Sequence, residues 1–186
     1  MNFLIIDTSS PQSFVALSRG DKLIIEHLPP LKQSQTLLLV IEKLLENTVI
    51  DFIAIGTGPG AFTGTRIGVM AAKALSFSKG ISLLPFCSLK IFTPCEDGPF
   101  TLYGDAKSRG FYALTGKKTG GSIVFDSPRL VTEGSVSSTL NVPILKQYLI
   151  EKFHKTPLSN HTEIIVSYLL ELEPEKKPKI LLGVEQ

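Results

Sequence analysis

The sequence contains no tryptophan, only two cysteines and only three histidines among 186 residues. Cys87 and Cys95 form no C-x-x-C pair, so we expect neither a disulfide nor a thiolate metal site. His27, His154 and His161 form neither H-x-x-x-H nor H-E-x-x-H, the spacings that bring two imidazoles together on a helix. These shortages predict a protein without a structural or catalytic metal ion.

A strong charge of one sign and a long apolar run are also missing. The net charge is +2 and the pI is about 8.5, whereas nucleic-acid-binding domains usually exceed a pI of about 9. No apolar run approaches the roughly 18 residues that span a bilayer. The N-terminal stretch MNFLIIDTSS lacks the basic start of a signal peptide. With 43% apolar residues, the chain is expected to be a cytoplasmic globular protein that does not bind membranes.

Turn residues and hydrophobic periodicity divide the chain into two α/β lobes. Residues 1–96 combine a three-stranded antiparallel meander with a β-α-β-α-β run, whose first helix has Ser34 as its expected N-cap. The segment 93–100 is rich in proline, glycine and acids and marks the boundary. Residues 97–186 begin again with a strand, a tight turn and a strand. Two helices, at residues 142–155 and 159–173, and a terminal arm follow.

A glycine-rich stretch, GTGPGAFTGTRIG at residues 56–68, stands between an apolar strand and a helix. A P-loop requires Gly-Lys-Ser/Thr, but residues 64–66 read Gly-Thr-Arg. Residues 56–61 match the Rossmann pattern G-x-G-x-x-A, but the acid expected about 20 residues later is missing, since residues 52–95 contain no Asp or Glu. We therefore expect a turn that binds no nucleotide. It consists of Gly56, Gly58, Pro59 and Gly60.

Small residues recur every four positions on the helix after this turn, at Gly64, Gly68, Ala72 and Ser76. A stripe of this kind allows another helix to approach closely. We interpret it as a surface for a protein partner, although the spacing equally permits packing inside its own domain. Arg66 lies at the positive end of the helix dipole, where a cation is unfavourable unless an anion meets it. The expected interface comprises Gly64, Arg66, Ile67, Gly68, Ala71, Ala72 and Leu75.

Three motifs together resemble the bacterial TsaB family, also called YeaZ, of tRNA threonylcarbamoyladenosine biosynthesis proteins. They are FLIIDTSS at residues 3–10, the glycine-rich stretch, and GDAKSRGFYAL at residues 104–114. The resemblance extends over roughly residues 2–115. Gln33, Ala61 and Lys107 depart from the family pattern, which has His, Ser and Arg there. The chain is also shorter than is usual in the family, which implies a shortened second lobe.

Membership of this family implies the two-lobed fold of the actin, sugar kinase and heat-shock ATPase group, with a ribonuclease-H-like core in each lobe. It also implies an accessory subunit without catalytic residues or a cofactor. That subunit pairs with its paralogue TsaD, and the ATPase TsaE joins the complex. TsaD transfers a threonylcarbamoyl group to N6 of adenosine 37 in tRNAs that read codons beginning with A, so contact with tRNA is indirect. A homodimer is the alternative when TsaD is absent.

An ATP-dependent phosphotransferase of the same fold is the competing interpretation. Asp7 and Thr8 follow the first strand and Asp105 ends the corresponding strand of the second lobe, where ATPases of this fold hold phosphate and magnesium. The resemblance implies that this use has been lost, so we treat the three residues as a vestigial nucleotide site. No G-x-S-x-G nucleophile motif is present in the sequence. A tRNA-binding module, supported only by the small positive charge, is a third interpretation.

Overall fold

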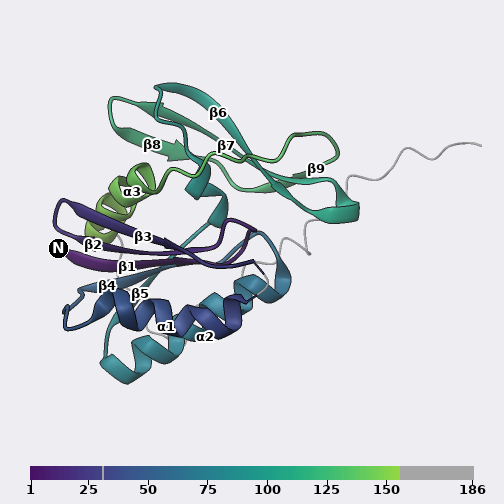
Figure 1. Ribbon diagram of the computed structural model, residues 1–186. Coiled ribbons are helices and arrows are strands. Elements are labelled where there is room, and N and C mark those ends of the chain that lie inside the picture. Colours follow the sequence, from purple (N-terminus) through teal and green to yellow (C-terminus); the bar gives the residue numbers. More distant parts are fainter. Residues whose placement is uncertain (31, 156–186) are drawn as a thin grey trace, which may run out of the picture.

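The computed structural model describes residues 1–30 and 32–155, which form two β-sheets with helices on both faces of the first sheet (Figure 1). The predicted helix at residues 159–173 and the terminal arm lie outside the described residues.

The first sheet has five strands in the order β3-β2-β1-β4-β5. Strands β1, β2 and β3 form the predicted antiparallel meander, and Gly20 supplies a positive φ of 56° at its hairpin turn. Strands β4 and β5 continue the sheet parallel to β1. In chain order the strands are β1 (Asn2–Asp7), β2 (Phe14–Arg19), β3 (Lys22–His27), β4 (Phe52–Gly56) and β5 (Ser82–Phe86).

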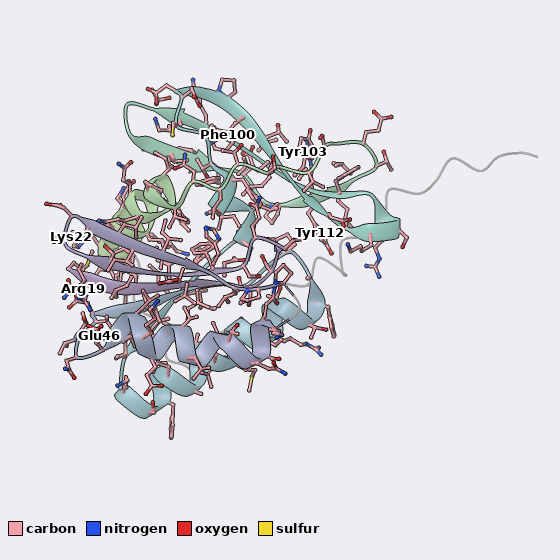
Figure 2. All side chains as sticks on the ribbon, viewed as in Figure 1. Arg19, Lys22, Glu46, Phe100, Tyr103 and Tyr112 are labelled. Atoms are coloured by element: carbon pink, nitrogen blue, oxygen red, sulfur yellow. The ribbon has the colours of Figure 1, made fainter. Side chains whose placement is uncertain are left out.

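Two helices, α1 (Gln33–Leu45) and α2 (Phe62–Lys79), lie side by side on one face of this sheet (Figure 1). Leu37, Ile41, Leu44 and Leu45 of α1 are buried against the sheet, whereas Leu38, which has the same helical period, is exposed. The helix begins after Lys32, so Ser34 lies within it and is not its cap. Gly80 ends α2 in the left-handed conformation, which glycine adopts without strain. Arg19 holds the C-terminal end of α1. Its Nη2 donates to Leu44 O at 3.2 Å and lies 3.9 Å from the Glu46 carboxylate (Figure 2).

Helix α3 (Val142–Lys155) covers the opposite face of the first sheet. Its buried residues Val142, Leu145 and Leu149 belong to one core cluster with Phe3 and Phe52 of the sheet. The predicted boundary between residues 96 and 97 places this helix in the second lobe. It packs on the first sheet instead, because that sheet presents a wide apolar face that an amphipathic helix buries.

The second sheet is antiparallel and is centred on β7. Leu102 and Leu114 on its inner face pack against Leu89, and the aromatic residues Phe100, Tyr103 and Tyr112 lie along it (Figure 2). Its strands are β6 (Gly98–Asp105), β7 (Phe111–Thr119), β8 (Ser122–Phe125) and β9 (Arg129–Val131). Two short 3-10 helices, η1 (Ser88–Phe92) and η2 (Lys107–Arg109), complete the described chain.

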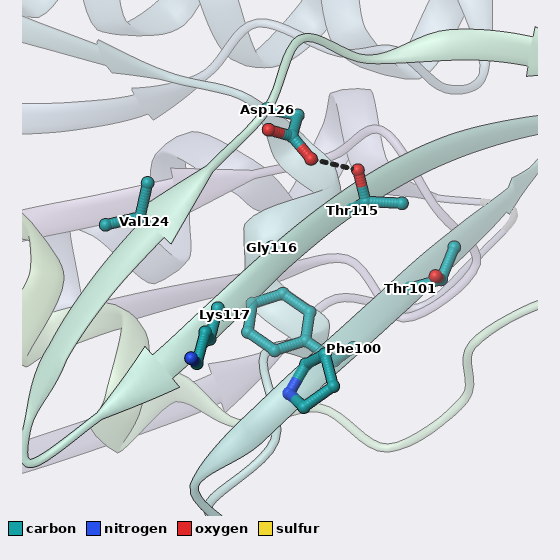
Figure 3. Close-up of a pocket in the computed structure, with 8 residues that line it drawn as sticks. Phe100, Thr101, Thr115, Gly116, Lys117, Val124 and Asp126 are labelled. Atoms are coloured by element: carbon teal, nitrogen blue, oxygen red, sulfur yellow. Dashed lines mark hydrogen bonds between the residues drawn. The ribbon is translucent and has the colours of Figure 1, made fainter.

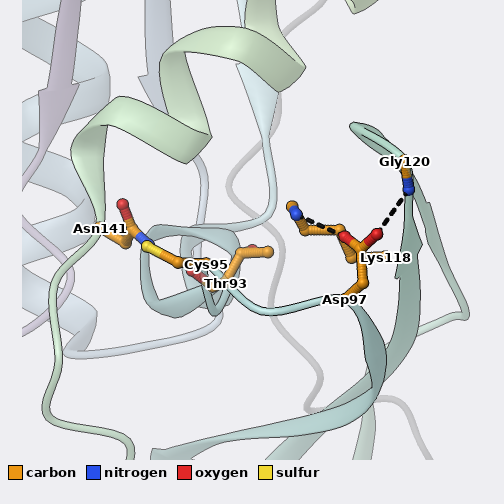
Figure 4. A network of polar contacts seen from close by, with 6 residues as sticks. All are labelled: Thr93, Cys95, Asp97, Lys118, Gly120 and Asn141. Atoms are coloured by element: carbon orange, nitrogen blue, oxygen red, sulfur yellow. Dashed lines mark hydrogen bonds and ion pairs between the residues drawn. The ribbon is translucent and has the colours of Figure 1, made fainter.

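Polar contacts hold residues 93–97, the segment that connects η1 to β6, in place (Figure 4). The Asn141 side-chain amide donates to Thr93 O and to Cys95 Sγ, each at 3.0 Å, and so joins the start of α3 to this segment. Asp97 accepts from the buried Lys118 at 2.6 Å and from the Gly120 N–H at 2.8 Å. The relative positions of α3, the segment and the second sheet are therefore fixed by specific bonds.

Candidate functional site

The glycine-rich turn is bonded to neighbouring parts of its own lobe. The N–H groups of Thr57 and Gly58 donate to Phe86 O at 3.0 Å and to Ser88 Oγ at 2.9 Å. The N–H of Ala61 donates to Ser9 O at 2.6 Å. A phosphate-binding loop directs such N–H groups at its ligand. Here three of them already have acceptors within the chain.

Glycine is required in this turn for two different reasons. Gly58 has a φ of 95°, the left-handed region that side chains disfavour. Gly56 and Gly60 are required for close approach, because a β-carbon there would lie 1.9 Å from Asp7 Oδ2 and 2.4 Å from Ser9 O. The left-handed conformation therefore requires glycine at Gly58, while Gly56 and Gly60 make room for Asp7 and Ser9.

Asp7 is a fully buried acid at the end of β1. Its Oδ1 accepts from the Ser9 N–H at 2.9 Å and from Ser9 Oγ at 2.7 Å. Its Oδ2 has no hydrogen-bond partner among residues 1–30 and 32–155. Burial raises the pKa of the Asp7 carboxyl above its ordinary value of 3.8, and the nearby hydroxyl groups of Ser88 and Ser9 offset part of that shift. Asp7 thus faces the interior of the first lobe.

The other residues of the expected nucleotide site have separate partners. Thr8 Oγ1 donates to Gly64 O at 2.7 Å and holds α2 on β1. Asp105 is partly exposed on β6 and forms an ion pair with Lys107 at 2.5 Å. The hydrogen bonds from Lys107 hold the pKa of the Asp105 carboxyl below its usual range. The structure therefore does not join Asp7, Thr8 and Asp105 through shared contacts.

The small-residue stripe of α2 packs against its own lobe, so its interpretation as a partner surface is wrong. Gly64, Gly68 and Ala72 are buried. A β-carbon at Gly64 would lie 2.1 Å from Thr8 O, and one at Gly68 would lie 2.3 Å from Thr8 Oγ1. The lack of side-chain volume lets α2 lie close to the first sheet, and spacing alone did not identify that neighbour.

The remaining residues of the expected interface lie nearer the surface. Ile67, Ala71 and Leu75 are partly buried and pack against the edge of the core. Arg66 is exposed, and its guanidinium carbon lies 3.7 Å from the centroid of the Phe62 ring.

Large apolar side chains project from the opposite side of the same helices. Leu38 and Leu39 of α1 are 60% and 65% exposed, and Met70 and Phe77 of α2 are 65% and 74% exposed. We call these four residues the outer helical face. The sequence contains a signal for them, because Met70 and Phe77 do not belong to the small-residue stripe. The prediction of a partner surface was based on the stripe and missed them. A hollow of about 310 Å³ adjoins this face and is lined by Phe62, Thr63, Arg66, Ile67 and Met70.

A second hollow, of about 570 Å³, lies over β6, β7 and β8 (Figure 3). Lys117 and Asp126 are its charged residues, and Thr115 Oγ1 donates to Asp126 Oδ2. None of the residues predicted for a site lines it.

Within residues 1–30 and 32–155, no three His, Cys, Asp or Glu side chains gather to hold a metal ion. In the same ranges, no helix is sufficiently long and apolar to span a membrane.

The fold defines the class of the protein as a two-sheet α/β protein of the actin, sugar kinase and heat-shock ATPase group. A solved structure described as "YeaZ from Pseudomonas aeruginosa" matches with a TM-score of 0.78 and covers 90% of this chain and 99% of that chain. At 19% identity this likeness establishes the fold, and the predicted fold class is confirmed. The family model "TsaD: tRNA N6-adenosine threonylcarbamoyltransferase" matches residues 32–126, about half of the chain, so the chain belongs to this family.

Curated relatives carry the name that the three motifs suggested. The "tRNA threonylcarbamoyladenosine biosynthesis protein TsaB" of Haemophilus influenzae is 34% identical over 95 residues, which are 48% of this chain and 40% of that protein. The TsaB protein of Bacillus subtilis is 34% identical over 97 residues, 48% of this chain and 42% of that protein. The match thus spans about two fifths of the length of these relatives. The resemblance to the TsaB family is confirmed.

Replacing Gly68 with leucine tests the packing of the stripe. We expect Gly68→Leu to lower the free energy of unfolding by about 1–3 kcal/mol or more, because overpacking forces Thr8 or α2 to move. Ala74→Leu, on the exposed side of the same helix, is the matched control and should change stability little. Urea denaturation followed by circular dichroism measures both. Equal stability of the two variants would contradict burial of the stripe.

Replacing Asp7 with asparagine tests the buried acid. Because the folded-state pKa is raised, the stabilising contribution of the carboxyl is complete below its unfolded value and is lost as the pH rises through the folded pKa. Asparagine does not ionise, so Asp7→Asn should gain stability relative to the wild type between about pH 4 and neutrality. Urea denaturation across this range measures the difference, with exposed Asp21→Asn as control. A difference that does not vary with pH would refute a raised pKa.

Proposed function

We propose that this chain is a noncatalytic subunit that docks on a TsaD-type transferase. In this role it activates the transferase in forming N6-threonylcarbamoyladenosine at position 37 of tRNAs that read codons beginning with A. Family membership and the TsaB relatives support the pathway. The exposed apolar residues of the outer helical face carry the proposal, because they supply a docking surface. The role belongs in the cytoplasm, with tRNA contacted through TsaD and with the ATPase TsaE joining the pair.

The outer helical face has the physical character of a helix-docking surface. Removing apolar area from water yields roughly 25 cal/mol per Å², and contiguous exposed apolar patches commonly mark interaction sites. Helices α1 and α2 are neighbours on one face of the first sheet (Figure 1), so a third helix can pack against both. The hollow at the start of α2 offers room for one anchoring side chain.

The turn and Asp7 support a noncatalytic role over phosphotransfer. Phosphotransferases of this fold need free backbone donors and an acid that reaches the metal-bound phosphates. In this chain the donors of Thr57, Gly58 and Ala61 bond internally, and Asp7 is enclosed by Gly56 and Ser9. These contacts favour a structural use of the segment.

Introducing a charge on the outer helical face tests the docking. Met70→Glu should weaken pairing with TsaD at least about tenfold, because a carboxylate left unpaired in an apolar contact costs more than the roughly 1.4 kcal/mol that corresponds to one decade. Analytical ultracentrifugation of the mixture measures pairing. Val124→Glu is the matched control, since Val124 is 67% exposed on the second sheet and Met70 is 65% exposed. Undiminished pairing of Met70→Glu would place the interface elsewhere.

Reconstitution separates the accessory role from the phosphotransferase alternative. The chain alone should form no threonylcarbamoyladenosine and hydrolyse no ATP. Added to TsaD, TsaE and the enzyme that forms the threonylcarbamoyl adenylate, it should restore modification of tRNA. ATP turnover by the purified chain that Asp7→Asn abolishes would overturn the proposal and favour the enzyme.

A further inference from the structure

Lys90, in the short helix η1, connects the second sheet to α3. Its Nζ donates to the hydroxyl of Tyr148 of α3 at 2.6 Å. The same nitrogen lies 4.2 Å from the centroid of the Tyr148 ring and 4.2 Å from the centroid of the Phe125 ring of β8. The two rings also meet edge to face, with their centroids 5.3 Å apart. We call Lys90, Phe125 and Tyr148 the interlobe clasp, because α3 covers the first sheet and β8 belongs to the second.

The amine of Lys90 lies among groups that do not neutralise its charge. In the part of the chain that the structure describes, Lys90 forms no ion pair with a carboxylate. The groups around it are Cys87 of the preceding turn, Tyr148 and Lys152 of α3, and the ring of Phe125. Burial lowers the pKa of the Lys90 ammonium from its ordinary 10.5 to about 8, and the Lys152 cation adds to that shift. Lys90 is still partly exposed, so small solutes can reach it.

A lysine amine becomes a nucleophile where burial and a neighbouring cation favour its uncharged form. At pH 7.5 about a quarter of an amine with a pKa near 8 is uncharged, against about one in a thousand for an ordinary lysine. The uncharged amine of Lys90 keeps a hydrogen-bond partner, because burial raises the pKa of the Tyr148 phenol to about 12 and its O–H remains a donor. The clasp therefore holds a nucleophilic amine that is open to water on part of its surface.

We propose that Lys90 accepts acyl groups from acyl phosphates and that its acylation opens the interlobe clasp. The amine attacks the carbonyl carbon of the donor, a C–N bond forms, the C–O bond to phosphate breaks, and phosphate leaves with the amine proton. The nearby Lys152 cation attracts an anionic donor of this kind. The amide product carries no charge, so the attraction to both ring faces is lost. The second sheet is then held less tightly on α3.

Incubation of the full chain with acetyl phosphate tests the reactivity of Lys90. Mass spectrometry of the digested protein should show acetylation of Lys90 at least about fivefold faster than that of the exposed Lys117 at pH 7.5. The rate at Lys90 should level off above about pH 8, whereas the rate of an ordinary lysine continues to rise toward its higher pKa. Lys152→Met should slow the reaction at Lys90, because it removes the neighbouring cation, and should leave Lys117 unaffected.

Hydrogen exchange measured by mass spectrometry tests the opening of the clasp. After acetylation, the amides of β8 and α3 should exchange at least about threefold faster, while those of β1 and β4 stay unchanged. Lys90→Arg is the matched control, since arginine keeps a cation beside the rings and is not acetylated by acetyl phosphate. The treated variant should therefore exchange like the untreated one. Lys90→Gln, which is uncharged, should show the faster exchange without treatment.

Each outcome bears on one part of the inference. Equal acetylation rates at Lys90 and Lys117, or a rate at Lys90 that does not level off near pH 8, would overturn the acylation site. Acetylated Lys90 with unchanged exchange, or the same change in treated Lys90→Arg, would overturn the clasp. The comparison of treated wild type with treated Lys90→Arg stands even where Lys90→Gln fails to fold. The chain is tested alone, so these results leave the proposed pairing with TsaD to its own experiment.

Discussion

The arrangement of the first lobe depends on one close contact, between residues 7–9 and the glycines of the GTGPGAFTGTRIG motif. At each of four glycines the place of a β-carbon is already filled by an atom of residues 7–9. The contact brings the backbone of α2 against β1 and leaves no room for larger side chains on that side. Val69 packs in the core beside the small residues, while Met70 and Phe77, on the side of α2 away from this contact, are exposed. The four positions are Gly56, Gly60, Gly64 and Gly68.

This contact also gives a physical meaning to a motif that resembles a nucleotide-binding turn. The strand, glycine turn and helix are present, yet the donors of the turn bond to β5, η1 and the β1–β2 loop. The buried carboxyl of Asp7 is part of the same packing, held by Ser9. A glycine-rich turn can thus be required for close packing of two backbones, and its sequence alone does not distinguish that use from phosphate binding.

Local features of the fold were predictable, while features that depend on a distant neighbour were not. The three-stranded meander and the strand pair β6–β7 follow from turn residues and periodicity, and the structure contains both. Glycine also stands where the backbone needs it, at the hairpin turn of Gly20 and at the end of α2 at Gly80. The direction of the small stripe depends on a contact between Thr8 and Gly64, 56 positions apart, and the destination of α3 depends on Phe3 and Phe52, which lie still farther from it in the chain. Periodicity identifies a buried face but not the element that buries it. The family was recoverable, because its three motifs can be read directly in the sequence at residues 3–10, 56–68 and 104–114.

The position of α3 has a consequence for synthesis of the chain on the ribosome. The first sheet is complete at Phe86, but the apolar face that contains Phe3 and Phe52 is covered only when residues 142–155 have emerged. At a translation rate of about 5–20 residues per second, this face stays open to water for several seconds. An uncovered sheet face is prone to aggregation during that interval. The nascent chain therefore exposes this face until its last described helix has been synthesised.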